Sequence, residues 1–313
     1  MNPRIILGGL KSYLLPVRLS TYTGTGGTTT GAYCYSVWMR HLSIIDRYVH
    51  PFRPGVVVEL GPGDSIGLGL AALLTGAESY HGLDVLEHAS VQTNERVFDE
   101  LIELFRRRAP IPDEGAFPQL LPRLPSYSYP TRLLDEATLS ERLSESSVSR
   151  LRAAIRNPGA GSSIHYSCPW SAQSVASCSA ELVISQAALQ EMDHVPSRDD
   201  LRNNMEAIAS YLKPGGVMSH QIDFSGPGGA EWNHHWTYGS FSWKLIRGKR
   251  PYYVNRAPLS EYLRLFDLVG CNVVGVDLAA REGLSRDRLA SPFKNLPDAD
   301  LRTRAALVVA VKR

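Results

Sequence analysis

The residues with the clearest chemical meaning form a short acidic and glycine-rich segment early in the chain. The run Val56–Val58 is β-branched, which is typical of a buried strand, and Glu-Leu-Gly-Pro-Gly-Asp follows at 59–64. Glycine has no Cβ, so a strand-to-helix turn built on Gly61 and Gly63 allows a bulky ligand to lie against the backbone. The segment therefore predicts a ligand-binding turn.

Motifs for two common nucleotide chemistries do not occur at this turn. The dinucleotide fingerprint G-x-G-x-x-G, started at Gly61, requires a glycine where Ile66 stands. The chain also contains no Tyr-x-x-x-Lys pair and no phosphate-binding G-x-x-x-x-G-K-[S/T] loop. These absences disfavour a nicotinamide-dependent oxidoreductase and a phosphate-transfer enzyme.

Glu59, Gly61 and Gly63 match E-x-G-x-G, which resembles the first motif of class I S-adenosylmethionine-dependent methyltransferases. In that family the acidic residue at the strand end lies near the amino acid portion of the cofactor. The helix that opens near Asp64 would direct its amide groups toward the cofactor carboxylate. Ser65 departs from the family pattern, because a third glycine is frequent there. The resemblance implies a cofactor site comprising Glu59, Gly61, Pro62, Gly63, Asp64 and Ser65.

The order of predicted elements is that of an α/β fold with a doubly wound, mostly parallel, seven-stranded sheet. Strands are expected at 56–60, 79–83, 163–167, 180–185, 217–222, 272–277 and 305–311, and helices at 66–75, 91–108, 133–156, 201–212 and 259–269. The Lys-Pro-Gly-Gly turn at 213–216 is similar to the connection into the fifth strand of these methyltransferases. We expect a helical N-terminal lid at 1–54, a methyltransferase domain at 55–313, and an inserted helical subdomain at about 86–161.

Ligands of open α/β sheets bind beyond the carboxyl ends of the strands, which implicates further residues. Asp84 ends the second strand about twenty residues after Gly61, the spacing at which a carboxylate bonds ribose hydroxyls. Ser185 and Gln186 would face the methionine portion or the substrate. Trp170, just after the third strand, is a candidate for stacking on adenine, with plain surface packing as the alternative.

Histidines near the fifth strand are the candidates for a general base in methyl transfer to oxygen. His220 ends a predicted strand, and His234 and His235 lie in an aromatic loop that begins at Trp232. Histidine has a suitable pKa, and Asp223 could orient one of them. Two alternatives stay open: a structural role for each histidine, and a divalent metal held by these four residues, although their spacing matches no standard ligand motif.

The same loop also suggests a substrate class. Its aromatic faces and its amide and guanidinium donors suit a polyhydroxylated or acidic substrate. The alternative is a satellite core around Trp232, Trp236 and Trp243.

Composition narrows the partners of the protein. The 313 residues carry a formal net charge of only +2, which gives no indication of nucleic acid binding. No apolar stretch reaches the roughly 18 residues that cross a bilayer, and Met1–Leu15 lacks a clean cleavage site. The four cysteines show no C-x-x-C spacing. We expect a cytoplasmic protein, and the sequence leaves its oligomeric state open.

Together these patterns predict an S-adenosylmethionine-dependent methyltransferase. The expected reaction is O-methylation of a sugar, a glycan or a small metabolite by in-line displacement with a histidine base. A methyltransferase-like protein that binds without catalysis is the main alternative, and a nicotinamide-dependent oxidoreductase is a weaker one.

Overall fold

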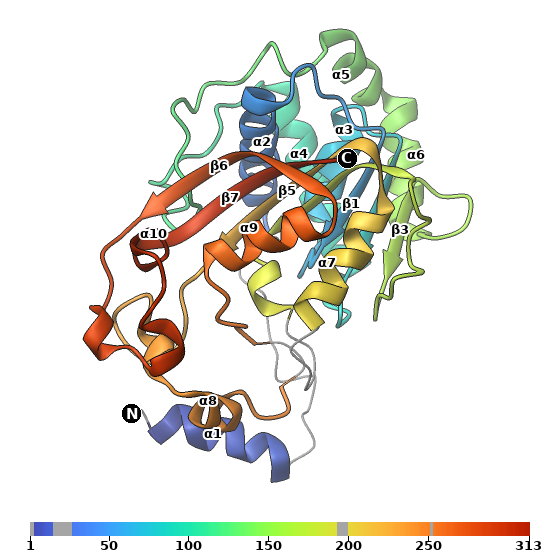
Figure 1. Cartoon of the computed structure of the whole chain (residues 1–313). Coiled ribbons are helices and arrows are strands. Elements are labelled where there is room, and N and C mark those ends of the chain that lie inside the picture. Colours follow the sequence, from blue (N-terminus) through green and yellow to red (C-terminus); the bar gives the residue numbers. More distant parts are fainter. Residues whose placement is uncertain (1–2, 15–26, 193–199, 251–252) are drawn as a thin grey trace.

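A single mixed sheet organises the chain (Figure 1). The computed structural model describes residues 3–14, 27–192, 200–250 and 253–313. The sheet has seven strands in the order β3-β2-β1-β4-β5-β7-β6, with β7 antiparallel to both of its neighbours and the other pairs parallel. The strands are β1 (Val56–Leu60), β2 (Ser79–Leu83), β3 (Ile164–Ser167), β4 (Ala180–Gln186), β5 (Leu212–Asp223), β6 (Cys271–Ala280) and β7 (Thr303–Lys312). The predicted fold class is confirmed.

Helices cover both faces of the sheet, and Figure 1 shows one layer in front of it and one behind. The first layer contains α2 (Gly31–Tyr48), α3 (Gly67–Leu74) and α4 (Val91–Arg106), and the second contains α7 (Asp200–Tyr211) and α9 (Leu259–Leu268). Successive residues of a central strand pack against opposite helix layers. Val57 packs in the cluster that contains α2 to α4, whereas Val58 packs in the cluster that contains α7 and α9. This alternation explains why the central strands are apolar on both faces.

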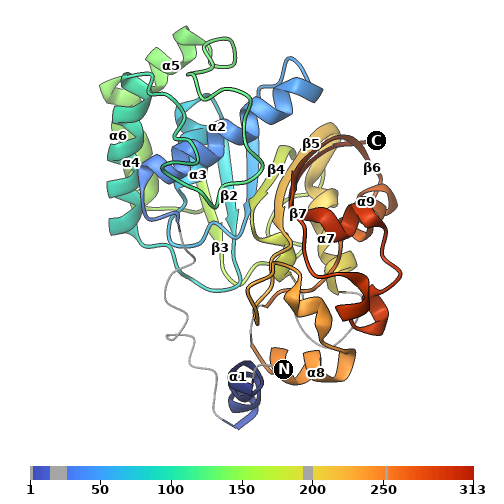
Figure 2. The same ribbon diagram turned by 90° about the vertical axis from the view of Figure 1, so that its left-hand side faces the viewer.

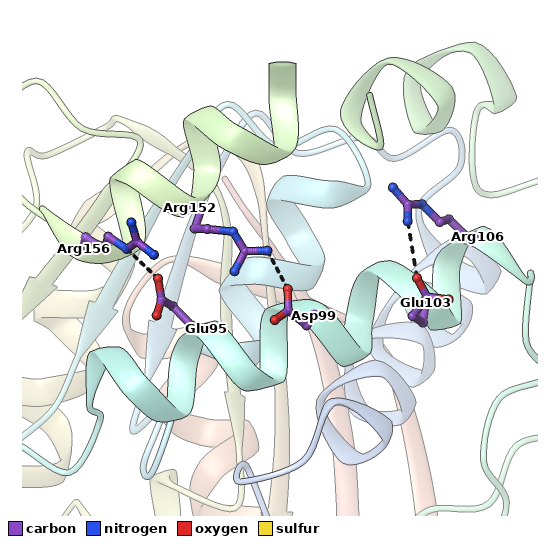
Figure 3. Close-up of polar contacts among 6 residues, drawn as sticks. All are labelled: Glu95, Asp99, Glu103, Arg106, Arg152 and Arg156. Carbon is purple, nitrogen blue, oxygen red and sulfur yellow. Dashed lines mark hydrogen bonds and ion pairs between the residues drawn. The ribbon is translucent and has the colours of Figure 1, made fainter. Parts of the chain in front are cut away.

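The segment between β2 and β3 belongs to the first layer. It contains α4, α5 (Glu136–Arg142) and α6 (Glu145–Arg156), so the helix predicted over 133–156 is divided in two, with Ser144 capping the second part. Apolar side chains of all three helices join the same core cluster. On the surface, Arg152 pairs with Asp99 and Arg156 with Glu95, each at 2.6 Å, which connects α6 to α4 (Figure 3).

The region before β1 differs from the expected lid. Most of α2 is buried against α3 and α4, and Trp38 at its centre is almost fully enclosed. This helix therefore supplies part of the core, and from the described part of this region Gly27, Thr28 and Tyr33 line the cavity at the strand ends. Of the predicted lid at 1–54, residues 1–2 and 15–26 lie outside the described residues.

Two further helices lie together at one end of the molecule, as Figures 1 and 2 show. They are α1 (Pro3–Leu14) and α8 (Ser240–Arg247), which are far apart in the sequence. A short helix, α10 (Asp298–Arg302), precedes β7. None of the helices among the described residues is long and apolar enough to cross a bilayer.

Candidate functional site

A cavity of about 360 Å³ lies where β1, β2 and β4 end. Its walls are formed by the glycine turn after β1, the residues after β2, the end of β4 with the short helix Leu189–Glu191, and the segment that leads into α2. The carboxyl ends of neighbouring parallel strands meet at one edge of a sheet, so residues distant in sequence converge here.

The glycine turn has a backbone that other residues rarely adopt. Gly61 and Gly63 have φ of +65° and +73°, and the Gly61 N–H donates to the carbonyl of Leu83 at 2.8 Å. A Cβ on Gly61 would lie 2.9 Å from the Cβ of Ala188 on the opposite wall. Two reasons therefore require glycine at position 61: its left-handed backbone conformation and the close approach of the opposite cavity wall.

Asp84 is held rigidly by backbone donors. One carboxylate oxygen accepts from the N–H of Val85 at 2.7 Å, and the other accepts from the N–H of Gly63 at 3.2 Å. Burial raises the pKa of Asp84, and these hydrogen bonds oppose the shift. The turn and the carboxylate thus position each other, with Asp84 lining the cavity.

Glu59 lies deeper in the same wall. It is buried, and it accepts a hydrogen bond of 2.6 Å from the hydroxyl of Tyr80. Burial raises the pKa of Glu59 to about 8, the bond from Tyr80 opposes this shift, and the charge of Asp84 adds to it. At neutral pH, Glu59 is therefore largely protonated, and a cation placed beside it would promote its ionisation.

A third carboxyl group comes from the residues after β4. Glu191 lines the cavity, and burial together with the charge of Asp84 raises its pKa to about 7. Its neighbour Gln190 is only 7% exposed and donates through Nε2 to the carbonyl of Ala187 at 2.8 Å. The Oε1 atom of Gln190 has no hydrogen-bond partner in the described part of the chain. The wall therefore offers a proton acceptor and a buried carbonyl oxygen that can still accept a hydrogen bond.

Gln186, at the end of β4, is held by hydrogen bonds to β5 and to α2. Its Nε2 donates to Oε1 of Gln221 at 3.0 Å, and its Oε1 lies 3.3 Å from Nε2 of His41. The other ring nitrogen of His41 shares a hydrogen bond of 2.8 Å with Ser219. Burial lowers the pKa of His41 to about 4, so the imidazole is neutral and orients Gln186.

The charge of the cavity lining is one-sided. Glu59, Asp84 and Glu191 line it together with His88, whereas the described lining contains no Lys or Arg. A ligand that carries positive charge is attracted by the ionised carboxylates and promotes ionisation of Glu59 and Glu191, whereas a pyrophosphate finds no described Lys or Arg to neutralise it. The lining therefore suits a sulfonium donor better than a dinucleotide.

Most of the predicted cofactor residues meet at the cavity. Glu59, Gly61, Pro62, Gly63, Asp84, Trp170 and Gln186 line it. The backbone N–H of Trp170 donates to the carbonyl of Asp84 at 3.0 Å, which brings the end of β3 beside the end of β2.

Three predicted cofactor residues lie outside this lining. Ser65 is buried and donates to the carbonyl of Thr28, so it connects the turn to the segment before α2. Ser185 is buried and shares a hydrogen bond with Nδ1 of His220 at 2.8 Å. Asp64 lies in the turn before α3, which begins at Gly67 rather than near Asp64.

The structure does not bring the predicted catalytic residues to the cavity. His220 packs against Phe266 and His235 lies between Trp236 and Trp243, and burial lowers the pKa of each imidazole to about 3. His234 contacts the ring of Tyr238, and Asp223 accepts from the N–H of Ser225 at 2.8 Å. The lining contains none of the four predicted residues, and no metal-binding group of His, Cys, Asp or Glu exists among the described residues.

The aromatic loop is largely core. Trp232 and Trp236 are buried in the cluster that contains α7 and α9, and Trp243 is buried in a smaller cluster around α8. The three tryptophans therefore do not form one satellite core: two belong to the main core and one to a small cluster, and this packing accounts for the aromatic composition of the loop.

Sequence reasoning missed several lining residues. Thr28, His88 and Glu191 belong to no motif that marks them. The carboxylate of Glu191, six residues after Ser185, was the one available signal, because ligands of such sheets bind beyond the carboxyl ends of the strands.

Comparisons with known proteins give similarity of fold only. No protein-family model matches the chain, and no curated protein matches its sequence. A methyltransferase of Mesorhizobium loti, described as S-adenosylmethionine-dependent, is 17% identical over 88% of this chain and 98% of its own, with a TM-score of 0.43. One from Methanosarcina mazei is 12% identical over 86% and 96%, with a TM-score of 0.41.

A longer neighbour is phosphoethanolamine N-methyltransferase 2 of Haemonchus contortus, solved with S-adenosyl-L-methionine. It is 16% identical over 91% of this chain and 57% of its own, with a TM-score of 0.40. All three neighbours are methyltransferases. Likenesses this low leave the function to be argued from the cavity itself.

Proposed function

We propose that this protein is an S-adenosylmethionine-dependent methyltransferase that methylates a hydroxyl group of a sugar, a glycan or a small metabolite. The observation that carries the proposal is the cavity at the carboxyl ends of β1, β2 and β4, with three carboxyl groups and no described Lys or Arg in its lining. S-adenosylmethionine has a sulfonium and an ammonium group against one carboxylate, so its net positive charge suits this lining.

The residues present fit this cofactor. Asp84 is fixed by backbone donors and keeps lone pairs that can accept from the ribose hydroxyls. Glu59 lies beside the glycine turn and would face the positive charge, and the indole of Trp170 can cover adenine. When bound, the cofactor supplies a methyl group on a positively charged sulfur, which is ready for displacement by a nucleophile.

In our proposal the proton of the acceptor hydroxyl goes to Glu191 rather than to a histidine. A hydroxyl is a weak nucleophile unless a base lies within hydrogen-bond reach, and a general base is most effective when its pKa is near the working pH. Glu191 lines the cavity and has a pKa of about 7. Gln190 and Gln186 line the same cavity and would orient hydroxyls of the acceptor.

Calorimetric titration with S-adenosylmethionine and, separately, with NAD tests the cofactor. We expect S-adenosylmethionine to bind and NAD not to bind, because the pyrophosphate would meet the carboxylate of Asp84 without a Lys or Arg of the described lining and would oppose ionisation of Glu59 and Glu191. Binding of NAD alone would overturn the proposal. Binding of the methyl donor without methyl transfer in a broad screen of hydroxylated acceptors would favour the non-catalytic alternative.

Glu191→Gln tests the base once an acceptor is known. The wild-type rate should rise with pH through about 7 as Glu191 ionises, and the variant should lose this limb together with roughly 10²- to 10⁴-fold in kcat. Glu87→Gln is the matched control, because Glu87 is exposed near the cavity but does not line it. An unchanged pH profile in Glu191→Gln would exclude Glu191 as the base.

A further inference from the structure

The helices α1 and α8 form a small unit that is packed through one face of each helix. Trp243 and Ile246 of α8 are buried against Ile5 and Ile6 of α1. The contact is close enough to require Gly9, since a Cβ there would lie 2.0 Å from the carbonyl oxygen of Leu245. We call these two helices and the residues up to Lys249 the α1–α8 unit.

The unit exposes apolar side chains on the faces that are not packed. Leu7 is 54% exposed, Leu10 and Tyr13 lie on the same helix and are exposed, and Phe241 of α8 is 76% exposed. Phe241 is the most exposed of the large apolar side chains in the described part of the chain. Apolar side chains concentrated in this way mark a surface that binds something.

Cations accompany these apolar side chains. Lys11, Lys244 and Lys249 are exposed on the unit, and the ammonium group of Lys249 lies 5.8 Å from the ring of Tyr13. The unit itself, residues 3–14 and 240–249, contains five Lys and Arg residues and no Asp or Glu. The rest of the chain has 28 Lys and Arg residues against 31 Asp and Glu, so the unit carries a net positive charge that the rest of the chain does not.

We propose that the α1–α8 unit binds an anionic lipid surface. Amphipathic helices with exposed leucine and aromatic side chains and with cations lie in the headgroup region of a membrane, where the apolar groups insert and the cations meet the headgroups. A second copy of this chain is a poorer occupant, because two identical surfaces without acidic residues repel each other.

The unit is joined to the wall of the cavity. Tyr253, which follows α8, forms a parallel bridge with Met192, and the Asn255 N–H donates to the carbonyl of Gln190 at 2.7 Å. Both Met192 and Gln190 line the cavity. Lipid binding would thus hold a membrane next to the cavity wall. The inference does not depend on the proposed methyl transfer, because lipid binding is measured without cofactor.

Co-sedimentation of the full chain with vesicles tests the inference. We expect binding to phosphatidylcholine vesicles that contain roughly one quarter phosphatidylglycerol, weak binding to phosphatidylcholine alone, and loss of binding at high salt. Lys11→Gln combined with Lys244→Gln should weaken partitioning roughly 25-fold, and Phe241→Ser roughly tenfold.

Two exposed positions elsewhere supply matched controls. Leu278→Ser removes an exposed apolar side chain from β6, and Arg107→Gln removes an exposed cation after α4, and both should bind vesicles like the wild type. Circular dichroism checks that every variant is folded.

Three results would overturn the inference: no binding to anionic vesicles at low salt, equal binding to both vesicle types, or unchanged binding in the α1–α8 variants. Concentration-dependent self-association that Phe241→Ser abolishes, without vesicle binding, would instead identify a second copy as the occupant.

Discussion

Binding of S-adenosylmethionine should release a proton, and Glu59 is the reason. Its pKa in the folded protein is about 8, so at pH 7 roughly nine tenths of the molecules carry a protonated Glu59. A positive charge beside a buried carboxyl group favours the ionised form, so binding should lower this pKa and expel the proton.

The magnitude follows from linkage. Between the pKa of Glu59 in the complex and its value of about 8 in the free protein, each bound donor releases about one proton, and the affinity should increase about tenfold per pH unit. The increase levels off above pH 8, where Glu59 is already ionised. Glu191, with a pKa of about 7, would add a smaller contribution in the same direction.

Isothermal titration calorimetry in buffers of different ionisation enthalpy measures the number of protons released. S-adenosylhomocysteine is the matched ligand, because it lacks the sulfonium charge and keeps the same amino acid portion. We expect more protons released with S-adenosylmethionine than with S-adenosylhomocysteine, and we expect Glu59→Gln to remove most of this difference. Equal proton release for the two ligands in the wild type would refute the electrostatic reasoning.

Three other outcomes follow from the structure. Gly61→Val should abolish binding of S-adenosylmethionine in calorimetry while circular dichroism shows a folded chain, because Gly61 has φ of +65° and its Cβ would press on the opposite wall; unchanged affinity would place the site elsewhere. Because His220 has a pKa of about 3 when folded, its contribution to stability is complete above pH 6.5 and is lost at about 1.4 kcal/mol per pH unit as the pH falls. In urea unfolding, the free energy of unfolding of His220→Gln should therefore depend less steeply on pH than that of the wild type. Equal pH dependence of the two proteins would contradict the buried imidazole. Leu151→Ala should lower the free energy of unfolding by about 2 to 5 kcal/mol, and Arg152→Ala on the same helix by about 1 kcal/mol or less, since the first leaves a cavity and the second removes a surface ion pair; similar losses would argue against a core role for α6.

Local sequence patterns were sufficient to predict the strands of the sheet and the glycine turn that begins the cavity. The run 56–58, the glycine turn and Asp84 were predicted from residue type and spacing, and the structure brings Gly61, Gly63 and Asp84 together at the cavity. Strand positions were predicted to within a few residues because an apolar run between glycine and proline turns is a local property. The helix predicted over 133–156 was wrong in extent, because Ser144 caps a new helix inside it.

The general base could not be predicted in the same way. A histidine at a strand end has the right chemistry, but the side chains of neighbouring strand residues point to opposite faces. His220 therefore shares a bond with Ser185 inside the α7–α9 layer, whereas Gln221 pairs with the cavity residue Gln186. The position of Glu191 after β4 is visible in the sequence, but its place in the cavity and its pKa, which burial and the charge of Asp84 raise to about 7, are set by the folded chain.

Sequence alone determined the order of helices and strands, the position of the glycine turn after β1 and the carboxylate that follows β2. Each of these features depends on residues that are neighbours along the chain. Tertiary structure decided which carboxyl groups share one cavity, which histidines are enclosed by aromatic rings, and that the first helix packs against one nearly 240 residues later. Electrostatic coupling and burial depend on distance in space, and the fold sets that distance.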